Sequence, residues 1–293
     1  MNVIQELILT ASDEKPDFEH GSIFFVGTAT VIIRYAGFTI LTDPNFLHAG
    51  EQVHVGYGLR ATRLTDPAIN IEDLPPIDLV VLSHIHEDHF DRVVQEKLDK
   101  TIPIVTTPQA TKFLRSKKFT SIYQLKTWQT FYLAKGEAIL RLTAMPGKHG
   151  PGPLSYLLPS VMGSMLEFQT SGEDTEFRIY ISGATLVFND LRKISQRFPE
   201  IDLALLHLGG TKVFGVMLTM DGQQGVQAIR IISPHTQAPS HLTVIPIHYN
   251  DYNVFKSSID DFVRAFNASG LENQVHYLYH GQTYSFEKSM SRA

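Results

Sequence analysis

The sequence of 293 residues contains no cysteine. This absence excludes disulfides, thiolate zinc fingers, iron–sulfur clusters and a cysteine nucleophile. Positive charge is also scarce, since 25 Lys and Arg stand against 30 Asp and Glu and the net charge is −5. We therefore expect no nucleic-acid partner, because a chain without a strong positive field holds a polyanion poorly. A weakly acidic chain does suit a protein that binds divalent cations through His, Asp and Glu.

Long hydrophobic runs are absent as well, and no apolar run reaches the roughly 18 residues that a membrane helix needs. Residues 1–15 carry Gln5 and Glu6 within their apolar stretch and no basic residue before it, so they do not resemble a secretion signal. We predict a cytoplasmic protein without membrane insertion that acts on a small molecule. Its hydrophobic share of 43% is enough to build a core.

Short β-branched and aromatic runs alternate with amphipathic stretches along the chain. The predicted strands are 23–26, 30–35, 38–43, 78–83, 102–106, 138–145, 155–158, 164–169, 177–182, 203–206, 243–247 and 275–279. The predicted helices are 91–100, 108–117, 189–198, 221–231 and 257–268. Residues 45–63 show neither period and are interpreted as a long loop, and residues 171–175 as a hairpin turn.

This alternation predicts an α/β protein with two packed mixed sheets and helices outside them. We expect one domain over residues 1–293, with two pseudo-halves that meet near residue 165. No repeat of fixed period occurs, so a solenoid or a propeller is not expected.

The most informative segment is Ser83-His84-Ile85-His86-Glu87-Asp88-His89-Phe90, which follows an apolar strand. In extended chain His84 and His86 project to one side and can hold one cation, whereas Asp88 and His89 turn towards a second. These nitrogen and oxygen donors suit Zn²⁺, with Mn²⁺ and Fe²⁺ as alternatives. Local packing or helix capping is a weaker explanation, because burying three imidazoles and a carboxylate requires a compensating partner.

The HxHxDH pattern after an apolar strand resembles the signature of the metallo-β-lactamase superfamily. His149 in the stretch from Pro146 to Gly152 and His248 after Pro246-Ile247 match that superfamily's further histidines in order and context. The resemblance implies a four-layer αββα sandwich with two metal ions, one held by His84, His86 and His149. The second ion would be held by Asp88, His89 and His248.

Within the superfamily, the chain looks most like the branch of ascorbate-6-phosphate lactonase and the phospholipase D that cleaves N-acyl phosphatidylethanolamine. The residues that carry this similarity are Thr42-Asp43-Pro44, the stretch from Leu206 to Thr211 and Pro246-Ile247-His248. The resemblance implies that a metal-bound hydroxide opens a lactone, ester or amide bond, with Asp88 orienting it or relaying its proton. Phosphodiester cleavage is the alternative reaction, because the same ligands serve both.

Ala184 departs from the family pattern, which places a bridging aspartate after a Ser-Gly turn such as Ser182-Gly183. Three interpretations are open: an engineered substitution that disables the enzyme, a natural one-metal enzyme, and a non-catalytic protein that binds metal or ligand. The loss should weaken chiefly the second metal site, because a bridging carboxylate offsets the repulsion between two dications. Asp190 is interpreted as the cap of the helix that follows it rather than as a replacement ligand.

Four further residues are candidates for contact with substrate or for support of the ligands. Asp43 is a plausible acceptor for the second N–H of a liganding imidazole, with a turn role before Pro44 as the alternative. His207 ends an apolar strand where sheets present groups to ligands, and His54 and Tyr57 are candidates to line a lid. No role is assigned to the histidines that lack a ligand context, which are His20, His235, His241, His276 and His280.

Overall fold

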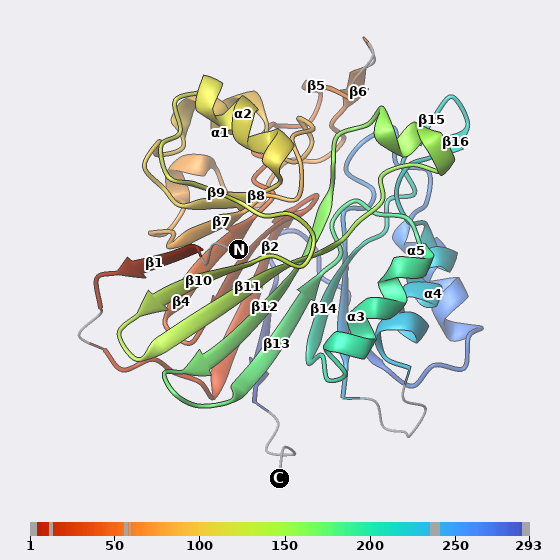
Figure 1. Ribbon diagram of the computed structural model, residues 1–293. Helices are drawn as coiled ribbons and strands as arrows, with labels where there is room; N and C mark the ends of the chain where they lie inside the picture. The colour runs from red at the N-terminus through yellow and green to blue at the C-terminus, as the bar shows by residue number, and fades with distance from the viewer. Residues whose placement is uncertain (1–4, 12–13, 56–57, 59, 235–240, 289–293) are drawn as a thin grey trace.

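Two β-sheets lie face to face in the computed structural model, which describes residues 5–11, 14–55, 58, 60–234 and 241–288 (Figure 1). The larger sheet has the order β1 (Gln5–Leu9), β10 (Thr130–Lys135), β11 (Ala138–Pro146), β12 (Met162–Thr170), β13 (Thr175–Ile181), β14 (Leu203–His207), β17 (Thr243–Ile247) and β18 (Gln274–Val275). The smaller has the order β19 (Thr283–Glu287), β2 (His20–Gly27), β3 (Thr30–Tyr35), β4 (Phe38–Thr42), β7 (Leu79–Val81), β8 (Ile104–Thr106) and β9 (Ile122–Gln124).

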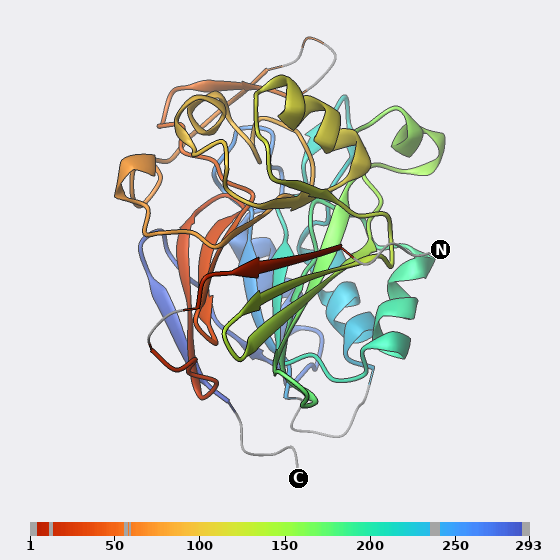
Figure 2. The ribbon, with the colours of Figure 1, turned by 60° about the vertical axis from the view of Figure 1, so that its left-hand side comes forward.

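Both sheets are mixed. In the larger one β13, β14, β17 and β18 run parallel, and in the smaller one β4, β7, β8 and β9 do so. Strand β1 lies at the edge of the larger sheet and pairs in parallel with β10 (Figure 2). Two short hairpins complete the strands: β5 (Gln52–His54) with β6 (Arg60–Thr62), and β15 (Lys212–Val213) with β16 (Val216–Met217).

Helices cover the outer face of each sheet (Figure 1). The α-helices are α1 (Arg92–Lys97), α2 (Pro108–Ser116), α3 (Arg192–Arg197), α4 (Gly222–Ile232) and α5 (Ile259–Asn267), and the short 3-10 helices are η1 (Ile71–Asp73), η2 (Gly152–Tyr156) and η3 (Asn189–Leu191). Among the described residues, no helix is long and apolar enough to cross a membrane.

The alternation of side chains along the strands creates three apolar layers. In β13, Ile179 and Ile181 belong to the core between the two sheets, whereas Tyr180 between them packs in the layer beneath α3, α4 and α5. On the other side, Val94 of α1 and Leu114 of α2 pack against the outer face of the smaller sheet. The predicted sandwich of two mixed sheets flanked by helices is therefore confirmed.

Most of the predicted elements are present with shifted ends. Asp91 caps α1 by accepting the Val94 N–H at 2.9 Å, and β12 and β13 form a hairpin whose turn contains residues 171–174. The two pseudo-halves were expected to meet near residue 165, which lies inside β12. The chain passes from the smaller sheet to the larger one earlier, between β9 and β10.

Three of the predicted segments are wrong. Residues 275–279 do not form a strand, because only Val275 of them lies in β18. Residues 155–158 do not form a strand, because the chain there belongs to η2 and the turn after it, and Pro153 has no N–H to give to a ladder. Residues 45–63 are not wholly irregular, since β5 and β6 lie within them.

Candidate metal centre

The candidate ligands converge because they follow the carboxyl ends of strands that point to one edge of the sandwich. Asp43 follows β4, and the segment from Ser83 to Phe90 follows β7 in the same sheet. From the larger sheet, His149 follows β11, Ala184 follows β13, His207 ends β14 and His248 follows β17. Residues separated by up to 205 positions in the chain thus meet in one largely buried cluster.

His84, His86 and His149 form the first group, with one ring nitrogen of each within 4.8 Å of the others. Nε2 of His84 lies 3.1 Å from Nδ1 of His86. Nδ1 of His149 lies 2.9 Å from the backbone oxygen of Ala184, which can only accept a hydrogen bond. His149 therefore carries its hydrogen on Nδ1 and leaves the lone pair of Nε2 available.

Asp88, His89 and His248 form the second group. Oδ2 of Asp88 lies 3.5 Å from Nε2 of His89 and 3.4 Å from Nε2 of His248. The rings of His84 and His89 have centroids 4.1 Å apart, so the two groups adjoin. These two groups contain the six residues that the family resemblance implies, and Asp43, His89 and His207 form a third group that shares His89 with the second.

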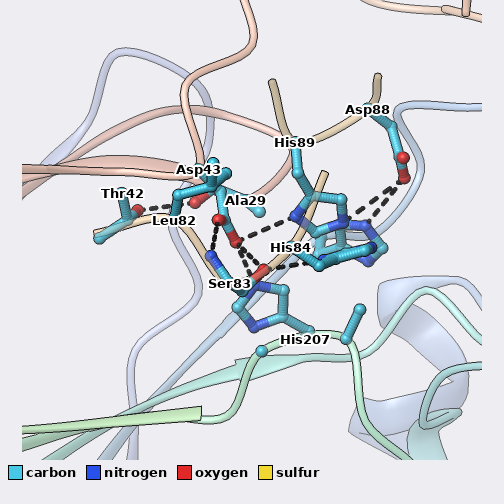
Figure 3. A network of polar contacts seen from close by, with 12 residues as sticks. Ala29, Thr42, Asp43, Leu82, Ser83, His84, Asp88, His89 and His207 are labelled. Carbon is cyan, nitrogen blue, oxygen red and sulfur yellow. Dashed lines mark hydrogen bonds and ion pairs between the residues drawn. The ribbon is translucent and has the colours of Figure 1, made fainter. Parts of the chain in front are cut away.

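Asp43 links the two groups from behind (Figure 3). Its Oδ2 accepts from Nδ1 of His89 at 2.9 Å and from the hydroxyl of Ser83 at 2.7 Å, and its Oδ1 accepts the Ser83 N–H at 2.6 Å. Because the Ser83 hydroxyl gives its hydrogen to Asp43, Ser83 Oγ accepts from Nδ1 of His84 at 3.0 Å. One carboxylate thereby directs the free lone pairs of His84 and His89 into the pocket.

His207 lies on the other side of Asp43, with Nε2 at 3.5 Å from Asp43 Oδ2 and Nδ1 at 3.2 Å from Ser182 Oγ. It therefore connects the turn before Ala184 to the carboxylate that orients His89. Sequence reasoning assigned no role to Ser83 or Ser182, although Ser83 directly precedes His84 and Ser182 lies two residues before Ala184.

Unpartnered polar atoms test whether this pocket suits a cation. Among the described residues, Asp88 Oδ1, His149 Nε2 and His248 Nδ1 are buried at this site without a hydrogen-bond partner. Nε2 of His207 and Nε2 of His248 also make no hydrogen bond, although they lie 3.5 Å and 3.4 Å from the carboxylates of Asp43 and Asp88. Leaving such atoms buried and unpaired costs free energy, so a group that satisfies them is expected. Imidazole and carboxylate donors facing one another fit a divalent transition metal.

The protonation states also suit a cation. Burial lowers the pKa of His149 to about 3 and that of His207 to about 4, and it holds the pKa of His84 well below its ordinary value. Burial alone raises the pKa of Asp43 and Asp88, but neighbouring imidazoles, His89 foremost, offset this and leave both values below the ordinary one. The two carboxylates raise the pKa of His89 against the effect of its burial, so the site combines ionised carboxylates with imidazoles that burial keeps neutral at His84, His149 and His207.

The backbone is held in unusual conformations at the same place. Asp43 has φ of 33° and His248 has φ of 61°, in the left-handed region that residues with a Cβ seldom adopt. Such residues persist where surrounding contacts overdetermine them, which is common at functional sites.

Other candidates lie at the margin or outside. His54 is exposed, and its N–H donates to Glu87 Oε2 at 2.7 Å, which places hairpin β5–β6 beside the segment from Ser83 to Phe90. Tyr57 lies outside the described residues. Asp190 is not a helix cap as expected, because it lies within η3 and pairs with Lys193 at 2.7 Å.

Comparison with known proteins agrees with this geometry. The family described as beta-lactamase superfamily domain matches residues 39–249. The chain belongs to this superfamily. The matched range includes all six candidate ligands, which lie between His84 and His248.

Individual relatives of this β-lactamase superfamily member are distant. A UPF0173 metal-dependent hydrolase of Nanoarchaeum equitans is 27% identical over 69% of this chain and 83% of its own. The N-acyl-phosphatidylethanolamine-hydrolyzing phospholipase D of Saccharomyces cerevisiae is 27% identical over 51% of this chain and 32% of its own. An isothiocyanate hydrolase from Delia radicum gut bacteria has a similar structure, with a TM-score of 0.73, 23% identity and coverage of 91% of this chain and 99% of that one.

Proposed function

We propose that this superfamily member is a metal-dependent hydrolase of a small molecule, working as one domain over residues 1–293. The observation that carries the proposal is the convergence of six ligand-type side chains, of which Asp88, His149 and His248 hold buried atoms without a hydrogen-bond partner. The UPF0173 relatives, named as metal-dependent hydrolases, support the same reaction class.

His84, His86 and His149 would hold one cation, and Asp88, His89 and His248 a second. Zinc is the expected metal for this set of nitrogen and oxygen donors, and Mn²⁺ and Fe²⁺ are the alternatives. Bound divalent cations supply Lewis acidity and make water more acidic. Asp43 and His207 would keep the imidazoles oriented, since ligating histidines need a partner for their second nitrogen.

Asp88 is the residue best placed to move a proton. Its Oδ2 faces His89 and His248, but its buried Oδ1 has no hydrogen-bond partner and is free to accept. We propose that Oδ1 accepts the proton of an attacking water and later returns it to the leaving group. Burial raises the pKa of the Asp88 carboxyl, but His89 and His248 offset this and hold the pKa below its ordinary value, which keeps this acceptor ionised at neutral pH.

Ala184 limits this activity in our proposal. Its buried side chain is a methyl where the family resemblance implies a bridging carboxylate, so the second cation would bind weakly and turnover would be impaired. The three interpretations of Ala184 predict different results when a carboxylate is introduced there. They are an engineered substitution, a natural one-metal enzyme and a non-catalytic protein.

The bond most consistent with the site is a lactone, ester or amide. Among the described residues, the buried cation is Arg63, which is bonded to Asn45 and Thr65 rather than to the pocket. In the part of the chain that the structure describes, no Arg side chain is hydrogen-bonded to a candidate ligand, and this supports the carboxyl class over a phosphodiester, for which a bidentate Arg contact is common.

The test is a substrate panel assayed with the zinc-loaded and manganese-loaded protein, in native form and as Ala184→Asp. The panel contains lactones, esters, amides, an aryl isothiocyanate, bis-p-nitrophenyl phosphate and an N-acyl phosphatidylethanolamine. We expect turnover of a carboxyl-type substrate that increases in Ala184→Asp. Turnover of the phosphate compounds alone would favour the phosphodiesterase, and no turnover by either form would favour a binding protein.

A further inference from the structure

A second cluster of buried charge lies beside the metal centre without facing into it. Asp251, three residues after His248, has 1% of its surface exposed, and Arg63 has 0%. Ionic side chains are seldom buried this completely unless they are paired. His280, from the segment between β18 and β19, completes the cluster with Nε2 at 3.0 Å from Asp251 Oδ1.

The Asp251 carboxylate joins three segments that are remote in sequence. Its Oδ2 accepts the Thr28 N–H at 2.9 Å, at the turn between β2 and β3. Its Oδ1 accepts from the Thr65 hydroxyl and contacts His280. The backbone oxygen of Asp251 also accepts the Leu64 N–H at 2.8 Å, which binds the same loop a second time.

A single residue separates this carboxylate from a candidate ligand. The backbone oxygen of Thr28 accepts the His248 N–H at 2.6 Å, while the N–H of Thr28 donates to Asp251. Both residues lie in the left-handed region, with φ of 55° for Thr28 and 61° for His248. Neither residue is a glycine, so these conformations depend on the contacts that hold them.

His280 fixes the charge of the cluster. Its Nδ1 lies 3.2 Å from the backbone oxygen of Asp66, and its Nε2 faces Asp251, so both nitrogens face acceptors. Only an imidazolium donates from both nitrogens. Burial lowers the pKa of His280, but the Asp251 carboxylate outweighs this effect and raises it above the ordinary value.

Gly27 provides the space for this arrangement. A Cβ atom at this position would lie 3.1 Å from Cε1 of His280 and 3.2 Å from Nη2 of Arg63. The glycine also has φ of 140°, which L side chains rarely adopt. The backbone of the β2–β3 turn can therefore approach both cations closely.

We propose that Asp251, clamped by His280, is a positioning residue that fixes the Thr28 carbonyl and through it the backbone of His248. The functional part of this inference rests on the proposed second cation site, to which His248 belongs. The structural part concerns the metal-free chain, so the two parts can fail separately.

The first experiment measures residue-resolved amide hydrogen exchange by NMR on the full-length, metal-free protein. In Asp251→Asn we expect the His248 amide to exchange about tenfold faster or more, because an amide oxygen accepts the Thr28 N–H without the charge of a carboxylate and Asn cannot pair ionically with His280. Asp78→Asn is the matched control, since Asp78 also accepts a backbone N–H, that of Thr39 at 2.8 Å, and pairs with a cation, Lys135. It should leave the His248 amide unchanged.

Unchanged exchange at His248 in Asp251→Asn would overturn the proposal. Equal acceleration of amides in β11 and β12 would also overturn it, because that result indicates general destabilisation. If Asp251→Asn does not fold, His280→Gln takes its place, with an expected acceleration of at least about threefold confined to Thr28 and His248.

The second experiment counts bound Co²⁺ and records its absorption spectrum. We expect Asp251→Asn to bind the more weakly held ion at least about tenfold less tightly than the native chain, with the tighter site unchanged. If Asp251→Asn binds both ions as tightly as the native chain does, the link between Asp251 and the second site is overturned. If the native chain binds no Co²⁺, the proposed function fails, and the exchange data still decide the positioning role.

Discussion

Nδ1 of His149 donates to the backbone carbonyl of Ala184 at 2.9 Å. The contact uses the peptide group of Ala184, so it does not depend on which side chain residue 184 carries. It therefore orients a candidate ligand of the first site even though the side chain expected to bridge the two sites is a methyl. This separation makes residue 184 a suitable place to test the second site alone.

Ala184→Asp should bind a second metal ion and raise turnover by at least about a hundredfold, because a second Lewis acid contributes several kcal/mol to stabilising transition-state charge. Metal content by mass spectrometry and steady-state kinetics on the best panel substrate measure both effects. Ala184→Asn is the matched control, since it adds a similar volume without the charge that offsets two dications. Equal metal content and turnover in Ala184→Asp and the native chain would contradict the assignment of this position.

Asp43→Asn should weaken metal binding about 10–100-fold, because the residues that orient metal ligands typically contribute that much. Both sites should be affected, since Asp43 bonds to His89 directly and to His84 through Ser83. Competition against a chelator of known affinity measures the change. Asp78→Asn, remote from the pocket, should bind metal as the native chain does, and a loss confined to one site would argue against the shared role of Asp43.

Removal of metal should lower the thermal stability of the protein. A cation at a thousand times its dissociation constant stabilises the folded state by about 4 kcal/mol, which corresponds to a decrease in Tm of roughly 10 °C on chelation. Differential scanning fluorimetry with and without EDTA measures this shift, and added zinc should reverse it. His84→Ala should show a smaller response to EDTA, and an identical response would place the metal elsewhere.

The Asp251–His280 pair should make stability depend on pH. The pKa of His280 is raised in the folded state, so the pair's contribution is complete below the unfolded value of about 6.5 and is lost as the pH rises through the folded value. Urea unfolding of the metal-free protein should therefore show that the native chain has a larger free energy of unfolding than His280→Gln near about pH 6. This difference should disappear as the pH rises to about 9. A constant difference between the two proteins across this range would contradict a charged His280.

The sequence predicted three consecutive strands of the smaller sheet well. Strands β2, β3 and β4 follow one another through tight turns, so glycine and β-branched residues mark them locally. Strands β1 and β10 were not predicted, and they pair with each other across more than a hundred residues. Their side chains are buried by tertiary contacts that the local sequence pattern does not predict.

The candidate site was predicted unevenly for a similar reason. The spacing of His84, His86, Asp88 and His89 in one short segment identified them, whereas His149 and His248 required the family resemblance. No sequence pattern marks Asp251, His280 or Thr28 as part of the site. A carboxylate three residues from a ligand and a histidine near the C-terminus are common in any sequence. Their relation appears only once the two sheets are packed.

The sequence alone determined the chemistry that this protein can use, since residue types set which atoms can donate, ligate or titrate. The tertiary structure decided which of those atoms share a pocket, which tautomer each imidazole adopts and which carboxylates stay ionised. These properties depend on distance and burial, and both arise only when the carboxyl ends of strands far apart in the chain are brought to one edge of the sandwich.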